Sequence, residues 1–329
     1  MVLNYQPCDY EPPAWAVNAH IQTVVAAKMA PKPVVTYNRE RWETPDHDFI
    51  DADWVGEKVD GKPLVVLFHG LEGSSQSHYA LALMDALAQK GWMGCVAQFR
   101  SCSGENNRLP RAYFAGDTAE HEWIFERLSK RFPTSPVFSV GVSLGGCQVA
   151  LFASRCAAIA KRFLTASVAV SAPQDLVAAN TLMQKGFSRV YILNFLRTLI
   201  PKVLQKCEMF PELRNKLDMK GIQNARDFVA FDSLFTAPMH GFVDAFDYWS
   251  KSSPKQYLKQ TGIPLLLINA MNDPFMPAKA LAQKEDVNDF VTLDYPSDGG
   301  HVGFPTGAFP GKIDYLPRKI LGYFENFLP

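Results

Sequence analysis

The sequence predicts an α/β protein: a mostly parallel central sheet with helices on both faces, an N-terminal extension and an inserted helical cap. From residue 64 onward, short apolar runs alternate with longer helical patterns. Several of these runs are apolar on both faces, as are the strands of a buried parallel sheet. The chain has 329 residues, of which 47% are hydrophobic and 20% charged, so it can bury a sizeable core.

Six apolar runs are the predicted strands of the core, and three helical patterns lie between them. Strand, helix and parallel strand in succession form the βαβ unit. The expected helices are His78–Lys90, Thr118–Arg131 and Gly145–Lys161. The expected strands are Leu64–Phe68, Gly94–Phe99, Pro136–Val140, Ala166–Val170, Pro264–Asn269 and Phe290–Asp294.

Two regions fall outside this alternation. Val34–Glu43 and Asp48–Val55 resemble strands, and we expect them to form a hairpin at the edge of the sheet. Leu176 to Asp244 is helical in pattern and contains no strong strand, which indicates an inserted cap. The predicted division is therefore an N-terminal extension with an edge hairpin (1–62), a first part of the core (63–175), a helical cap (176–244) and a second part of the core (245–329).

The cap contains one strongly patterned helix. Apolar residues cluster on one face between Val190 and Leu204, and four positive charges with no acid occur from Arg189 to Lys206. Pro201 is expected to kink this helix. Two interpretations stay open: a helix that packs on the core with a solvated basic face, or a lid that contacts apolar substrate or, transiently, a membrane surface.

Charge and cysteine usage exclude several classes of protein. Lys and Arg together equal Asp and Glu at 33 each, so nothing indicates a nucleic-acid partner. The six cysteines include no Cys-x-x-Cys pair, which argues against a disulfide framework and a zinc site. Met1–Val17 has no Lys or Arg and three prolines, unlike a signal peptide, and the apolar stretches are too short to span a bilayer. We therefore expect a cytoplasmic protein.

The main chemical signal is Gly141-Val-Ser-Leu-Gly145, placed between a predicted strand and a predicted helix. A nucleophile on a sharp strand-to-helix turn has a strained backbone, and residues two positions away must be small for the turn to close. Ser143 is therefore the predicted nucleophile.

A serine hydroxyl needs a base, and histidine is the side chain whose ordinary pKa suits the task. His301 lies on a glycine-rich loop after the last predicted strand, where α/β active sites are found. His69 also follows a strand, but its setting suits a loop that shapes an oxyanion hole. We predict His301 as the base. The other histidines, expected at the surface or in satisfied packing positions, are His20, His47, His78, His121 and His240.

The third group must be a carboxylate that orients the imidazole. Asp273 follows the strand Pro264–Asn269 and gives the order Ser, Asp, His along the chain. Asp175 is the main alternative. Asp298, three residues before His301, is not expected to turn back onto the ring.

Acyl chemistry also needs hydrogen-bond donors for the developing oxyanion. We expect the backbone N–H groups of Leu71 and Leu144 to supply them, whatever their side chains. No metal or organic cofactor is needed for this chemistry.

Several of these segments together resemble the YheT-like branch of the α/β-hydrolases, and the resemblance extends over nearly the whole chain. The N-terminal Asn18–Thr23 is similar to that branch's Asn-Pro-His-Leu-Gln-Thr. The other matching segments are His69–Ser75, Phe99–Glu105, Gly141–Gly146, Asp273–Phe275 and Gly299–Phe304.

The resemblance implies an α/β-hydrolase fold, with nucleophile, acid and base at Ser143, Asp273 and His301. It also implies an activity among esterases, lipases or acyltransferases that act on acyl esters. The sequence differs from the branch at Ala19, where Pro is usual, at Ser101, where Gly is usual, and at Cys147, where Asn is usual.

The predicted function is a serine carboxylic-ester hydrolase that takes a small-molecule acyl ester through an acyl-enzyme. An acyltransferase would use the same residues with an alcohol in place of water. A non-catalytic binding protein on a hydrolase scaffold is the third possibility, because fold alone does not fix function.

Overall fold

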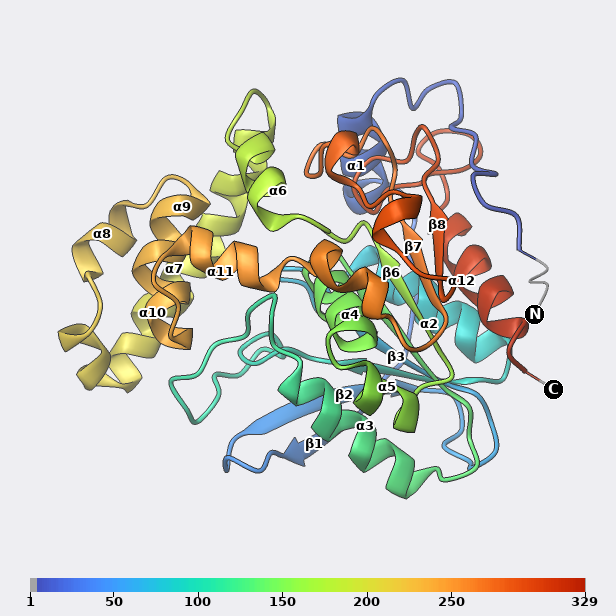
Figure 1. The fold of residues 1–329 in the computed structure, drawn as a ribbon, viewed down its shortest axis with the longest axis horizontal. Helices are drawn as coiled ribbons and strands as arrows, with labels where there is room; N and C mark the ends of the chain where they lie inside the picture. Colours follow the sequence, from blue (N-terminus) through green and yellow to red (C-terminus); the bar gives the residue numbers. More distant parts are fainter. Residues whose placement is uncertain (1–4, 329) are drawn as a thin grey trace.

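The computed structural model describes residues 5–328 and contains one eight-stranded sheet in the order β1-β2-β4-β3-β5-β6-β7-β8 (Figure 1). β3 to β8 run parallel to one another, whereas β2 pairs antiparallel with both β1 and β4. The predicted α/β class is therefore confirmed. Residues 1–4, part of the segment tested for a signal peptide, and residue 329 lie outside the described residues. The strands are β1 (Asn38–Glu43), β2 (Phe49–Val55), β3 (Leu64–Phe68), β4 (Met93–Ala97), β5 (Val137–Val142), β6 (Ala166–Val170), β7 (Leu265–Ile268) and β8 (Val291–Asp294).

The predicted hairpin forms one edge of the sheet, but it is shorter than expected. β1 begins at Asn38, which pairs with Trp54 near the end of β2, so residues 34–37 have no strand beside them. Two arginines of β1 face aspartates across the hairpin. Arg39 Nε lies 2.6 Å from Asp53 and Arg41 Nε lies 2.8 Å from Asp51.

Helices cover both faces of the sheet, because alternate strand residues bury against different helices. One face packs on α2 (His78–Gln89) and α12 (Tyr315–Glu325). The other packs on α3 (Ala119–Arg131), α4 (Leu144–Ser154) and α5 (Ala157–Phe163).

Three features of the helices differ from the sequence prediction. The helix expected over Gly145–Lys161 is two helices, because α4 ends at Ser154 and α5 begins at Ala157. α12 was not anticipated. Neither was α1 (Ala19–Lys28), which begins after Asn18, whose side chain accepts a hydrogen bond from the Ile21 N–H at 3.0 Å.

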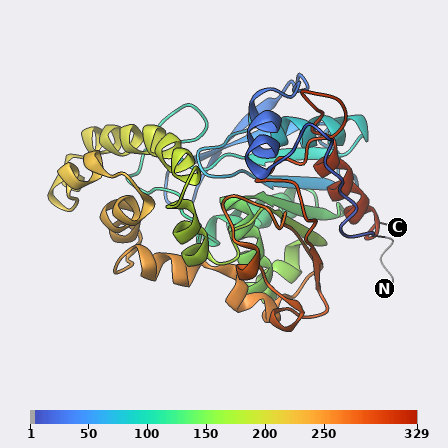
Figure 2. The ribbon, with the colours of Figure 1, turned by 90° about the horizontal axis from the view of Figure 1, so that it is seen from above.

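A helical layer between β6 and β7 projects beyond one end of the sheet (Figures 1 and 2). Most residues of one buried apolar cluster lie in this layer, and the cluster also includes Ala115, Cys147 and Phe275 of the core. α11 packs against α6, α9 and η2, which favours a cap that extends beyond the predicted boundary at residue 244. The elements are α6 (Leu176–Met183), α7 (Ser188–Met209), η1 (Pro211–Asn215), α8 (Met219–Asn224), α9 (Phe228–Phe231), the π-helical η2 (Asp232–Thr236), α10 (Ala237–His240) and α11 (Ala245–Ser252).

The rest of the second half of the chain is mostly loop around three short 3₁₀ turns, η3 (Pro254–Gln260), η4 (Ala278–Ala280) and η5 (Lys284–Asp286). Within residues 5–328, no helix combines the length and the apolar character needed to cross a bilayer.

Candidate active site

Ser143 occupies a tight turn between the end of β5 and the start of α4. Its φ of 53° and ψ of −116° are unusual for a residue with a side chain, and such strain is stored at functional sites. Two glycines make the turn sterically possible. A Cβ on Gly141 would lie 2.2 Å from the Gly145 oxygen, and one on Gly145 would lie 2.3 Å from the Phe68 oxygen.

A hydrogen-bonded chain joins the three predicted side chains. His301 Nε2 lies 3.0 Å from Ser143 Oγ, and His301 Nδ1 lies 2.9 Å from Asp273 Oδ2. Because the carboxylate can only accept, Nδ1 carries the proton and Nε2 is left to accept the serine hydroxyl. The structure therefore brings together, from the loops after β5, β8 and β7, the three side chains predicted as nucleophile, base and orienting acid.

Asp273 and His301 are held in place and are largely shielded from water. Asp273 is only 3% exposed, and its Oδ1 accepts the Phe275 N–H at 2.8 Å. The Phe275 ring stacks on the His301 ring, with centroids 4.0 Å apart and planes 16° apart. This packing limits the orientations of the imidazole.

The alternative acids lie elsewhere. Asp175 is the N-cap of α6, where its Oδ1 accepts the Ala178 N–H at 2.9 Å. Asp298 Oδ1 accepts from Gln22 at 3.1 Å and from Asn272 at 2.8 Å. Neither carboxylate has a hydrogen bond to His301 in the described part of the chain.

The N-terminal helix α1 supports the loops that carry Asp273 and His301. Gln22 is fully buried, and its Oε1 accepts from Asn272 Nδ2 and from the Gly299 N–H, each at 2.9 Å. Thr23 Oγ1 accepts the His301 N–H at 2.9 Å. Analysis of the residues alone missed these roles; the signal that could have found them is the resemblance at Asn18–Thr23.

His69 is a structural histidine at the end of β3. Its Nε2 accepts the Phe99 N–H at 3.1 Å, and its Nδ1 lies 2.8 Å from the Gly70 oxygen. Burial lowers the pKa of His69 to about 4, so the ring is neutral and Nδ1 donates to Gly70. These bonds shape the loop that continues into Leu71.

The five remaining histidines lie away from Ser143 Oγ. His20 Nδ1 lies 3.1 Å from the Tyr191 hydroxyl, His78 Nε2 lies 3.0 Å from the Val302 oxygen, and His47 is exposed. The other histidines were expected at the surface or with their hydrogen bonds satisfied, and His121 does not fit this expectation. It is buried on Phe68, and neither ring nitrogen has a partner among residues 5–328. His240 Nε2 is likewise buried without one.

The two expected oxyanion donors flank the nucleophile. Leu144 is the first residue of α4, where backbone N–H groups lack partners inside the helix. Gly70, which precedes Leu71, lies so close to Ser143 that an added Cβ would be 3.2 Å from Ser143 Cβ. Over residues 5–328, neither the Leu71 nor the Leu144 N–H has a hydrogen-bond acceptor in the protein.

A cavity with about 1180 Å³ of empty space, part of it open to solvent, lies between Ser143 and the cap. Its walls are mostly apolar. The core contributes Ser143, His301, Leu71 and Leu144, and the cap contributes Phe195, Leu199, Lys202, Val203, Phe228, Phe231, Phe235 and Trp249 among others. The inner face of α7 therefore lines the cavity, while Leu196 packs inside the cap.

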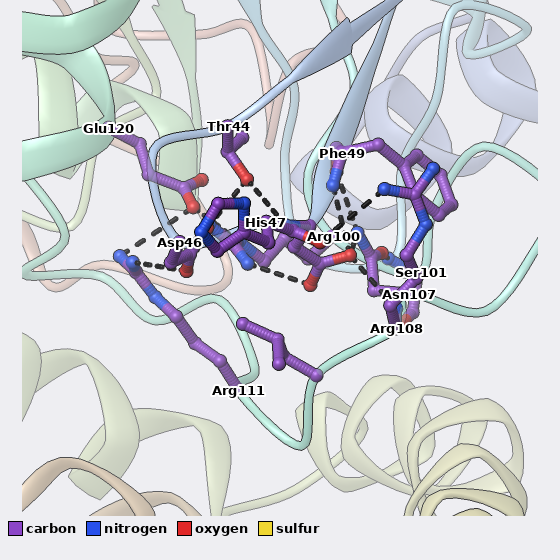
Figure 3. Close-up of polar contacts among 12 residues, drawn as sticks. Thr44, Asp46, His47, Phe49, Arg100, Ser101, Asn107, Arg108, Arg111 and Glu120 are labelled. Atoms are coloured by element: carbon purple, nitrogen blue, oxygen red, sulfur yellow. Dashed lines mark hydrogen bonds and ion pairs between the residues drawn. The ribbon is translucent and has the colours of Figure 1, made fainter.

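A loop after β4 forms another part of the cavity wall, and buried charges hold it in place. Arg100 Nη1 lies 2.7 Å from Asp48 Oδ2, and its other nitrogens pair with Asp46 and Glu120. Figure 3 shows Arg111 reaching toward Asp46 and Glu120, with Arg100 between these acids and Asn107. Asn107 Oδ1 accepts the Ser101 N–H at 2.5 Å. The turn between β1 and β2 thus holds the loop that lines the cavity.

The three residues that differ from the family pattern, Ala19, Ser101 and Cys147, have different surroundings. Ser101 lines the cavity and has a φ of 63°, where glycine is favoured. Cys147 is fully buried and does not line the cavity, but it donates to the oxygen of Pro173, which does, at 3.0 Å. Ala19 is the first residue of α1.

Comparison with known proteins decides the family. The model of the family described as "alpha/beta hydrolase fold" matches residues 63–308. The chain is 35% identical over 319 residues to the Escherichia coli (strain K12) protein named "Putative esterase YheT", covering 94% of this chain and 91% of that protein. The chain belongs to the α/β-hydrolase family.

Other proteins are similar at lower sequence identity. Human phospholipase ABHD3 is 28% identical over 325 residues, which cover 96% of this chain and 78% of that protein. A solved structure of the Pyrococcus furiosus esterase Pf2001 superposes with a TM-score of 0.57 at 16% identity, covering 91% of this chain and 97% of that one. At this low identity, the superposition with the Pyrococcus furiosus esterase shows only that the two proteins share a fold.

Proposed function

We propose that the protein is a serine carboxylic-ester hydrolase that works through an acyl-enzyme. The observation that carries this proposal is the hydrogen-bonded chain from Ser143 through His301 to Asp273 at the wall of a large apolar cavity. Relatives named as an esterase and as a phospholipase support an ester as the substrate.

In the first half of the reaction, Ser143 Oγ attacks the ester carbonyl while His301 Nε2 takes the hydroxyl proton. The new imidazolium is stabilised by Asp273, and the Leu71 and Leu144 N–H groups stabilise the oxyanion. His301 then gives its proton to the leaving alcohol. In the second half, water repeats these steps on the acyl-enzyme and releases the acid.

The cavity favours an apolar acyl group. Aromatic and aliphatic side chains of the cap face the nucleophile, so a chain that extends from the carbonyl would leave water on binding. An acyltransferase would use the same residues with a bound alcohol in place of water. A non-catalytic binding protein would have no use for a hydrogen-bonded base beside Ser143.

Transient contact with a membrane surface is also part of the proposal. The start of α7 exposes Phe187 (54%), Val190 (51%) and Leu193 (44%), next to the exposed Arg189 and Arg197. Apolar side chains flanked by positive charge suit an interface with anionic lipids. Sedimentation with anionic and with neutral vesicles tests this contact. The cytoplasmic location stays a prediction from the cysteines.

Ester turnover and covalent labelling test the main proposal together. A panel of p-nitrophenyl esters from acetyl to palmitoyl measures turnover, and a fluorophosphonate probe reports an activated serine. Ser143→Ala is expected to abolish both while the protein still folds. Labelling that persists at another serine would contradict the assignment.

A further inference from the structure

The loop that carries Leu71 contacts the cap through an ion pair. Glu72 directly follows Leu71, and its Oε1 accepts from Lys202 Nζ of α7 at 3.0 Å. Within the described residues, this is the only hydrogen bond or ion pair between residues 69–73 and the cap. The position of one cap side chain is therefore linked to the residue beside a proposed oxyanion donor.

The backbone at Glu72 is held in a conformation that is unfavourable for a residue with a side chain. Its φ is 55°, in the left-handed region. The Tyr113 hydroxyl accepts the Glu72 N–H at 2.9 Å and donates to Glu72 Oε1 at 2.9 Å. Tyr113 itself stacks on Phe99, with ring centroids 5.0 Å apart. Core contacts thus fix one side of Glu72, and Lys202 fixes the other.

The environment of the pair makes it more than a solvated surface contact. The Glu72 side chain is 8% exposed and that of Lys202 is 34% exposed, and both line the cavity beside Ser143. Removing one partner of a shielded ion pair leaves the other charge without compensation, which favours a rearrangement. For Glu72, the rearrangement available is rotation of a strained loop that begins at Leu71.

We propose that Lys202 is a positioning residue: by holding Glu72, it keeps the Leu71 N–H aimed at the developing oxyanion and so couples the cap to the chemistry. This inference rests on the proposed ester hydrolysis. Loss of a whole oxyanion donor costs about 10² to 10³ in kcat, so a displaced donor costs less. We expect a loss of about tenfold when the ion pair is broken.

The test is a double-mutant cycle on the full-length protein with p-nitrophenyl acetate, whose acyl group is too short to depend on the apolar wall. Lys202→Met and Glu72→Gln are each expected to lower kcat and kcat/KM together by about tenfold. The double variant should lose less than the product of the two single losses, because both changes break the same ion pair, whereas Lys202→Met also removes the contact of Nζ with Cys102 Sγ at 3.8 Å. Lys202→Arg should restore most of the rate.

A matched control and a second readout separate positioning from folding. Lys220→Met makes the same chemical change at an exposed position of α8 and should keep the parent kcat. The rate of fluorophosphonate labelling should fall in Lys202→Met as kcat does. If Lys202→Met fails to fold, Lys202→Gln takes its place in the cycle.

The outcomes separate this inference from the proposed function. Parent kcat in a folded Lys202→Met or Lys202→Gln protein, or losses that add in the double variant, would overturn the coupling alone. A change confined to KM would show that Lys202 acts in binding and would also overturn it. A parent protein with neither turnover nor labelling overturns both proposals.

Discussion

Replacing Gln22 by Ala should weaken both the fold and the active site, because one buried amide joins two loops. Its Nε2 donates to the Ala16 oxygen at 2.9 Å and to Asp298 at 3.1 Å, while its Oε1 accepts from Asn272 and from the Gly299 N–H. Each hydrogen bond contributes about 1 kcal/mol net, and a buried group left without a partner costs about 1–3 kcal/mol. The hydrogen bond between Asn272 and Asp298 would remain in the variant. The Ala16 oxygen and the Gly299 N–H would be left without the partner that Gln22 provides.

The expected result is a free energy of unfolding lower by about 2–4 kcal/mol. We also expect kcat to fall about tenfold or more, because Asn272 adjoins Asp273 and Gly299 is two residues from His301, and displaced catalytic groups lose rate steeply. Denaturant unfolding followed by tryptophan fluorescence and hydrolysis of p-nitrophenyl butyrate measure the two effects. Gln223→Ala, at an exposed position of α8, is the control. An unchanged unfolding midpoint together with an unchanged kcat in Gln22→Ala would refute the reasoning.

Three further predictions concern the acid, the cavity and the cap. Asp273→Asn should stay folded but lower kcat about 10⁴-fold, whereas Asp175→Asn should stay near the parent because an amide oxygen still caps α6; the reverse pattern would exchange their roles. Leu199→Ala should lower kcat/KM for decanoyl esters more than for acetyl esters, at about 0.8 kcal/mol or fourfold per lost methylene contact, and equal losses would place the acyl chain elsewhere. Burial raises the pKa of Asp232 from 3.8 to about 6, so this group's contribution to stability falls as the pH rises from about 4 to 6 and stays low above that. The difference in Tm between Asp232→Asn and the parent should therefore be more favourable to the variant at pH 8 than at pH 4. A Tm difference that does not change with pH would contradict this.

The sheet and the proximity of Ser143, His301 and Asp273 could be predicted because their signals are local. A strand buried on both faces, such as Leu64–Phe68, needs apolar residues throughout its length, and that run is visible in the sequence. The glycines around Ser143 are fixed by backbone collisions within a few residues. Strand order then places the loops with His301 and Asp273 at the same edge of the sheet.

The contributions of α1 and the cap could not be derived in this way. Gln22 acts on Gly299, 277 residues away, and nothing in the composition of α1 records that contact. On α7, Leu196 packs inside the cap while Leu199 faces the cavity, although the two residues are chemically identical. Which side of α7 lines the cavity depends on how the helix packs against the rest of the protein.

The charged hairpin at the edge of the sheet has a consequence for self-association. An exposed edge strand offers unpaired backbone groups to any other chain, and charged side chains there discourage such pairing. Five of the six residues of β1 are polar or charged, and Arg39 and Arg41 are neutralised by aspartates of its own neighbour, β2. A strand from another chain that paired with β1 would lie beside Arg39 and Arg41, which already form ion pairs with Asp53 and Asp51. The charged hairpin thus disfavours aggregation through pairing of this edge with other chains. Apolar residues at positions 39 and 41 would remove this protection.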